Sequence, residues 1–91
     1  MSPVVTHDRK ARRFETQVEG ASCVLDYQLD DGVMTITHTG VPSAVGGRGI
    51  ASALVQAALA AAREDHWMVL PACSYAEAWM RRHPEFDDLR V

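Results

Sequence analysis

The sequence has 91 residues, of which 47% are hydrophobic and 23% charged, and its formal net charge at pH 7 is −3. This length suits a single domain over residues 1–91 with one small core, and the negative charge argues against nucleic acid as the main partner. No apolar run approaches the roughly 20 residues of a membrane span, and none follows the basic start, so we expect a cytoplasmic protein without membrane contact.

The basic N-terminus and the scattered cysteines and histidines indicate no binding site. Arg9, Lys10, Arg12 and Arg13 favour a solvated arm over a binding patch. Cys23 and Cys73 lie far apart, and the four histidines form no HxH or HxxxH pair. Neither spacing is typical of a metal site, so we expect no bound metal. We also predict that both cysteines are free thiols.

Three strands are predicted in the first half of the chain. Residues 12–18 and 21–29 alternate between apolar and polar side chains, and residues 33–39 are rich in β-branched residues. Turn sequences, EG at 19–20 and DDG at 30–32, separate the three segments. The strands therefore predict an antiparallel meander.

The second half predicts helix, strand and helix. Residues 50–64 combine helical apolar spacing with many alanines, residues 66–70 suit a buried strand, and a second helix spans about 74–82. The helix at 50–64 is long enough for a crossover, which makes the strands on either side of it parallel. The fold class is therefore α+β, with a mostly antiparallel sheet and two helices.

A glycine-rich loop directly precedes the first helix. Gly46, Gly47 and Gly49 allow close backbone approach, and the first turn of the helix leaves N–H groups without partners. Together these features form a site for phosphate or pyrophosphate, to which Arg48 adds positive charge. The loop satisfies neither the Walker pattern nor the full Rossmann pattern. From the local sequence alone, a plain structural loop remains an equal alternative.

Three motifs carry a resemblance to a known family. HTGVP followed by GGRGIA and an alanine-rich helix resembles the acetyl-coenzyme A site of the GNAT N-acetyltransferase superfamily. Gly49 and Ala51 match fixed positions of that family's loop, whereas Gly46 stands where Gln or Arg is usual. PACSYAEAW followed by HPEF resembles a very small single-domain branch of the superfamily. The resemblance runs from about Glu19 to Leu89.

The resemblance implies a sheet that is splayed open between the strand ends near Val41 and Leu70. Pantetheine would pair with backbone near Thr39 to Val41, and pyrophosphate would meet the amides of Gly47 to Ala51. Arg81 and Arg82 would only complement the helix dipole, or one of them, Arg82, would reach the 3′-phosphate. The expected cofactor-binding residues for acetyl-CoA or coenzyme A are Thr39, Gly40, Val41, Gly46, Gly47, Arg48, Gly49, Ile50, Ala51, Ser74 and Arg82.

Cys73 is the first candidate catalytic residue. Ser74 and Glu77 have capping-box spacing, so Ser74 is expected to cap the second helix with Cys73 just outside it. Nearby unpaired N–H groups would lower the pKa of the thiol, which suits a nucleophile or a base, and the resemblance points the same way. The alternative is a small packing residue.

His38 and Tyr75 are the other catalytic candidates. His38 ends a strand beside the expected cofactor gap and is a candidate base, although its alternation with Met34 and Ile36 also suits a buried, hydrogen-bonded side chain. Tyr75 is a candidate acid for the leaving thiolate or a packing residue. The tyrosine that the family usually places later in this helix is absent.

The resemblance therefore implies an acetyl-CoA-dependent N-acetyltransferase that acts on an amine, either a small molecule or a protein. The chain lacks the N-terminal elements with which larger members enclose the acceptor. We thus expect an open acceptor face that suits a protein or peptide amine, in a monomer or a weak homodimer. The alternatives are a CoA-binding module without catalysis and a small interaction protein.

Overall fold

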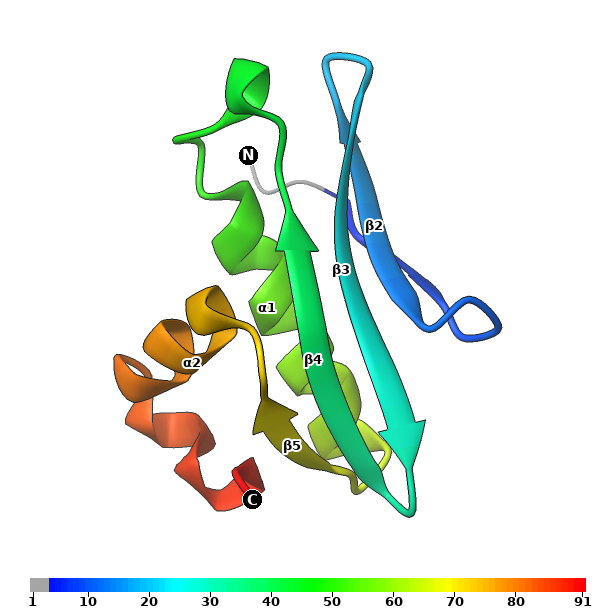
Figure 1. Cartoon of the computed structure of the whole chain (residues 1–91), viewed down its shortest axis with the longest axis vertical. Coiled ribbons are helices and arrows are strands. Elements are labelled where there is room, and N and C mark those ends of the chain that lie inside the picture. The colour runs from blue at the N-terminus through cyan, green and yellow to red at the C-terminus, as the bar shows by residue number, and fades with distance from the viewer. Residues whose placement is uncertain (1–3) are drawn as a thin grey trace.

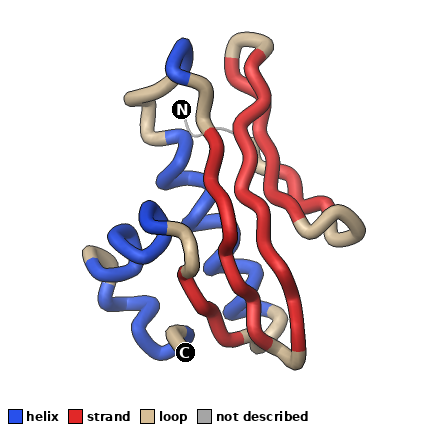
Figure 2. The backbone as a smooth tube through the Cα atoms, in the orientation of Figure 1, coloured by secondary structure: helices blue, strands red, loops and turns tan. Residues whose placement is uncertain are grey.

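The computed structural model describes residues 4–91, which form one five-stranded sheet and two α-helices (Figure 1). The strands lie side by side in one sheet (Figure 2), and their order follows the chain. All neighbouring strands are antiparallel except β4 and β5. The elements are β1 Thr6–Asp8, β2 Arg13–Val18, β3 Ala21–Asp30, β4 Val33–Gly40, the 3-10 turn η1 Ser43–Val45, α1 Ile50–Glu64, β5 Met68–Pro71, α2 Ser74–Arg81 and the 3-10 segment η2 Pro84–Leu89. The predicted α+β class, antiparallel meander and parallel crossover are confirmed.

One core lies between the sheet and the helices. Helix α1 spans the predicted residues 50–64, and its buried stripe consists of Ile50, Leu54, Val55, Ala58, Leu59 and Ala62. This stripe packs on the inward side chains of β2, β3 and β4. Helix α2 contributes Ala76, Trp79 and Met80 to the same core, and the Trp79 Nε1–H donates to Ser52 Oγ of α1 at 2.8 Å. Both helices therefore cover one face, and the other face of the sheet carries no helix among residues 4–91 (Figure 1).

Strand β1 lies where a solvated arm was expected. His7 stacks on Phe14 with ring centroids 4.0 Å apart and makes a 2.6 Å hydrogen bond with the Tyr27 hydroxyl. Arg9 forms a 2.9 Å ion pair with Asp65 at the end of α1. Arg9, Lys10, Arg12 and Arg13 are exposed, as predicted, but the segment before them forms a strand that the sequence did not predict. A three-residue strand is too short to show a period, and one of the side chains that hold it, Tyr27, lies far along the chain.

Strand β5 is an edge strand rather than the buried strand expected at 66–70. Val69 is buried, but Met68 and Leu70 are 39% and 43% exposed because their side chains point to the helix-free face. On the outer edge of β5, the Val91 N–H donates to the Val69 carbonyl at 3.0 Å. The end of the described chain therefore covers part of this edge.

A β-bulge changes which residues of β4 face the core. Tyr27 pairs with Ile36 but Asp26 pairs with His38, so Thr37 is an extra residue in β4. As a result, Thr39 continues the core-facing row of Met34 and Ile36, whereas His38 is exposed. The alternative that His38 is a buried side chain beside Met34 and Ile36 is therefore wrong.

The parallel pair β4–β5 separates at Ile36, as expected. The last paired residues are Ile36 and Pro71, and the Ile36 carbonyl then accepts the N–H groups of Ala72 at 3.0 Å and Cys73 at 2.9 Å. Beyond this point β4 continues to Gly40 with no paired strand on that side among the described residues. The sheet is thus splayed between the end of β4 and the start of α2.

Within residues 4–91, no helix combines the length and apolar character needed to cross a bilayer.

The contact between His7 and Tyr27 predicts a pH dependence of stability. Burial, and to a lesser extent the charge of Arg9, lower the pKa of His7. Below the ordinary histidine pKa of about 6.5, the unfolded chain binds more protons than the folded protein, so stability decreases as the pH falls through this value. Urea unfolding of His7→Gln should show a smaller loss between about pH 7.5 and 5 than the unchanged protein.

His66→Asn supplies the matched control, because it also removes one histidine, but an exposed one that is not packed on Phe14 and Tyr27. The account is contradicted if His7→Gln and the unchanged protein lose stability equally over this range.

Candidate active site at the splay of the sheet

The start of α1 presents backbone N–H groups that no side chain caps. Gly49 is the N-cap residue, and its φ of 73° lies in the left-handed region, as does the φ of 77° at Gly47. The first hydrogen bond of the helix runs from the Ala53 N–H to the Gly49 carbonyl at 3.0 Å. The amides of residues 50–52 therefore have no partner within the helix, and the helix dipole adds partial positive charge there.

A pocket of about 270 Å³ opens over this helix start. Its lining residues come from the end of β4, the glycine loop, the first turn of α1 and the start of α2: Val41, Gly46, Gly47, Gly49, Ile50, Ala51, Ser52 and Tyr75. Six of the expected cofactor-binding residues and one catalytic candidate thus meet in one place. Sequence reasoning missed Ser52, although it stands where the Rossmann pattern has its third glycine.

A second hollow of about 400 Å³ lies beside β1 and β2. It is lined by Val4, Thr6, Glu15, Thr16 and Gln17, and neither a helix start nor a thiol contributes to it. We place the candidate site at the smaller pocket because the amides of α1 gather there.

Two residues of the glycine loop differ from the expected arrangement. The Arg48 guanidinium forms an ion pair with Glu19 in the β2–β3 turn, and Arg48 does not line the pocket. The Gly46 N–H donates to the Ser43 carbonyl at 3.2 Å and closes η1. The candidate anion donors therefore begin at Gly47 rather than at Gly46.

The capping box predicted for α2 is wrong. Cys73 is the N-cap residue, and the helix begins with a hydrogen bond from the Glu77 N–H to the Cys73 carbonyl at 3.0 Å. Ser74 is the exposed first helical residue, while the Glu77 carboxylate binds Arg81 at 2.8 Å and Arg90 at 2.5 Å. The bond from Cys73 N–H to the Ile36 carbonyl explains this start, because it anchors the chain one residue earlier.

Arg82 lies at the opposite end of α2 from Cys73. It is the exposed C-cap residue of an eight-residue helix, which places it about 12 Å along the helix axis from the start. It does not line the pocket. The structure thus separates Arg82 from the other expected cofactor-binding residues.

The Cys73 thiol is half-buried and faces Thr39 across the gap. Its Sγ atom lies 3.7 Å from Thr39 Oγ1. Burial acts to raise the pKa of Cys73, but hydrogen bonding from the Ala76 N–H, the Thr39 hydroxyl and the N–H groups of Tyr75 and Thr39 outweighs burial and lowers the pKa below its ordinary value. These hydrogen bonds therefore make the thiolate form of Cys73 easier to reach than in an ordinary cysteine.

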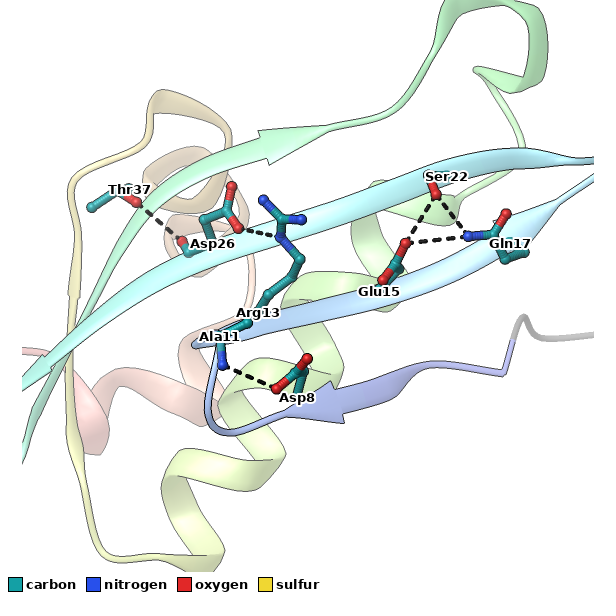
Figure 3. A network of polar contacts seen from close by, with 8 residues as sticks. All are labelled: Asp8, Ala11, Arg13, Glu15, Gln17, Ser22, Asp26 and Thr37. Atoms are coloured by element: carbon teal, nitrogen blue, oxygen red, sulfur yellow. Dashed lines mark hydrogen bonds and ion pairs between the residues drawn. The ribbon is translucent and has the colours of Figure 1, made fainter.

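His38 lies on the other side of the sheet from Cys73. Its cross-strand partner Asp26 is bound by Arg13, with 2.6 Å between Arg13 Nε and Asp26 Oδ1 (Figure 3). The same network view shows Glu15 accepting a hydrogen bond from Ser22 on this helix-free face. The two catalytic candidates Cys73 and His38 thus occupy opposite faces of the splay.

Among residues 4–91, no three side chains of His, Cys, Asp or Glu are grouped so that they could hold a metal ion.

Known proteins are similar to this chain in sequence and in fold. Residues 13–89 match the family model for GCN5-related N-acetyl-transferase. Protein NATD1 of Gallus gallus is 35% identical over 83 residues, which cover 88% of this chain and 76% of that protein. Protein NATD1 of Homo sapiens is 34% identical over 83 residues, covering 88% and 74%. The NMR structure of a GCN5-like protein from Staphylococcus aureus has a TM-score of 0.77 at 22% identity, covers 99% of this chain and 89% of that chain, and supports the fold.

The contact between Thr39 and Cys73 predicts the reactivity of the thiol. Thr39→Val removes the hydroxyl that stabilises the thiolate, so it should raise the pKa of Cys73 and shift its alkylation by iodoacetamide to higher pH. Thr39→Ser should retain the profile of the unchanged protein. Mass spectrometry resolved by site separates Cys73 from the buried Cys23. Identical pH profiles for Thr39→Val and the unchanged protein would show that the hydroxyl has no such role.

Proposed function

Because the chain belongs to the GCN5-related N-acetyltransferase family, we propose that it transfers an acetyl group from acetyl-CoA to an amine. The observation that carries this proposal is the pocket of about 270 Å³ at the uncapped start of α1. A diphosphate is an anion of the kind that unpaired helix amides bind. The pocket continues toward Val41, at the end of the strand that loses its partner.

The residues around the pocket suit coenzyme A. A Cβ atom added at Gly47 or Gly49 would meet no other atom within 4 Å, so the space over these residues is open. Both residues have a positive φ, a backbone conformation that residues with a side chain rarely adopt. The amides from Gly47 to Ala51 would hold the diphosphate. The free edge of β4 near Thr39 would pair with the extended pantetheine arm, as another strand would.

Bound acetyl-CoA supplies an acyl thioester whose carbonyl carbon accepts a nucleophile. In direct transfer, the neutral amine forms the new C–N bond as the C–S bond breaks, and His38 takes the proton that the amine nitrogen loses. Tyr75 lines the pocket, and its hydroxyl would donate a proton to the departing sulfur. Backbone N–H groups at the gap would polarise the carbonyl.

Cys73 offers a second route to the same products. Its thiolate, favoured by the start of α2 and by Thr39, would form acetyl-Cys73 as the first C–S bond breaks. The amine would then take the acetyl group and restore the free thiol. Intact-protein mass spectrometry after incubation with acetyl-CoA distinguishes the two routes. Only the second route adds one acetyl group to the unchanged protein, and the Cys73→Ser variant should not carry this group.

The acceptor that fits best is an amine on a peptide or protein. The helix-free face of the sheet leaves His38 exposed, and His38 lines neither of the two pockets described above. A polypeptide side chain could approach over this face.

Coenzyme A should stabilise the protein in a thermal unfolding experiment. At one hundred times its Kd a ligand adds about 2.7 kcal/mol, which corresponds to a rise in Tm on the order of 10 °C for a domain of this size. Pantetheine, which lacks the diphosphate, should give a much smaller rise. Gly49→Ala should abolish most of the rise, because a left-handed φ strains alanine at the helix start.

Gly32→Ala is the matched control, since Gly32 has a φ of 77° and equally open surroundings but lies in the β3–β4 turn at the other end of β4. Both variants should lose about 1 kcal/mol of stability, and only Gly49→Ala should lose the rise in Tm with coenzyme A.

A rise in Tm with coenzyme A, but no acetyl transfer to a lysine peptide, would indicate a binding module. No response to coenzyme A would exclude the proposed function.

A further inference from the structure

The His38 imidazole occupies the space that a side chain at residue 40 would fill. A Cβ atom added at Gly40 would lie 2.9 Å from His38 Nε2 and 3.7 Å from His38 Cδ2. The first distance is shorter than real Cβ atoms show, so the ring would have to move. Because Gly40 is not among the residues with positive φ, its backbone does not require glycine. Glycine at residue 40 therefore matters because it has no side chain, and not because of its backbone conformation.

The ring thereby lies over Gly40, in the part of β4 that extends beyond its pairing with β5. His38 and Gly40 are two residues apart in one strand, so both face the same side of the sheet. Thr39, between them, faces Cys73 on the helix side. The imidazole is therefore folded against the backbone of the segment that has lost its partner β5, on the face that no described helix covers.

The His38 ring is the neighbour that would clash with a side chain at residue 40. The next nearest atom to an added Cβ is Val24 Cγ2 at 3.6 Å, an ordinary van der Waals distance. Across the strand pair, the Asp26 carboxylate is held by Arg13. An alanine at residue 40 would thus meet one unfavourable contact, with the end of a flexible and exposed side chain, and the protein should still fold.

We propose that Gly40 is a positioning residue that leaves room for the His38 imidazole over the unpaired end of β4, so that the acceptor amine is deprotonated from the helix-free face while Cys73 occupies the opposite face. This inference rests on the proposed function. The neutral imidazole takes one proton from the amine nitrogen as the C–N bond forms, becomes imidazolium, and later releases that proton to water. The acceptor and the thiol then approach the reacting carbon from different sides.

A double-mutant cycle tests this role with acetyl-CoA and a peptide that carries one lysine. His38→Ala should lower kcat on the order of 10²-fold, and Gly40→Ala should lower it about 10-fold because the displaced ring still reaches the amine part of the time. The double variant should be no slower than His38→Ala alone, and the KM for acetyl-CoA should stay unchanged. Gln28→Ala, on the same face of β3, should match the unchanged protein. Additive losses, or a raised KM in Gly40→Ala, would overturn the proposal.

An NMR measurement tests the positioning without any activity. The unchanged protein should show a nuclear Overhauser contact between the His38 ring and the Gly40 Hα protons, and Gly40→Ala should shift the His38 ring signals while those of His66 stay in place. Absence of the contact would overturn the proposal. Acetyl transfer that fails in the unchanged protein, with this contact present, would instead contradict the proposed function and the role of His38 as base, leaving Gly40 as a packing position.

Discussion

The candidate site depends on how the Ile36 carbonyl ends the parallel pairing of β4 and β5. This one oxygen accepts the N–H groups of both Ala72 and Cys73, so the chain leaves the sheet immediately after Pro71 and enters α2. The same contact makes Cys73 the N-cap residue of α2. A longer ladder would have covered the edge of β4 and carried Cys73 away from Thr39. The gap, the thiol and the free strand edge therefore have one structural origin.

The splay places the candidate residues on two faces of the sheet. On the helix side, the starts of α1 and α2 converge, and the dipole of each helix adds partial positive charge, beside the pocket for α1 and beside Cys73 for α2. On the other side lie His38 and the polar row of β2 and β3, which no described helix covers. The bulge at Thr37 decides which residue lies on which face, because it brings Thr39 to the helix side and turns His38 to the helix-free side.

Much of the architecture could be predicted because, in a long segment, the spacing of apolar residues indicates whether the segment is a helix or a strand. Residues 50–64 show a clear apolar stripe, and the turn sequences between the first strands are unambiguous, so the order of elements and the parallel crossover were predictable. The glycines before the alanine-rich helix left an anion site and a plain loop as equal alternatives, and the resemblance of the motifs to a known family favoured the site at which the pocket is found. In each case the signal lies within a continuous stretch of chain.

The errors share a different origin, because each depends on residues that are distant in sequence. The bulge that exposes His38 arises from pairing with Asp26, and the ion pair of Arg48 requires Glu19. The cap of α2 is set by Ile36 rather than by Ser74, and β1 is held by Phe14 and Tyr27. Local rules apply to one segment at a time, and tertiary contacts override them at these positions.

The central claim is that the amides from Gly47 to Ala51 bind the diphosphate of coenzyme A, and an amide NMR titration tests it most directly. As coenzyme A is added, the amide signals of Gly47, Arg48, Gly49, Ile50 and Ala51 should move together and saturate at one Kd, while those of the β3–β4 turn stay in place. If the loop signals stay in place while signals elsewhere move, or if no signal moves, the assignment of this helix start as the cofactor site is contradicted.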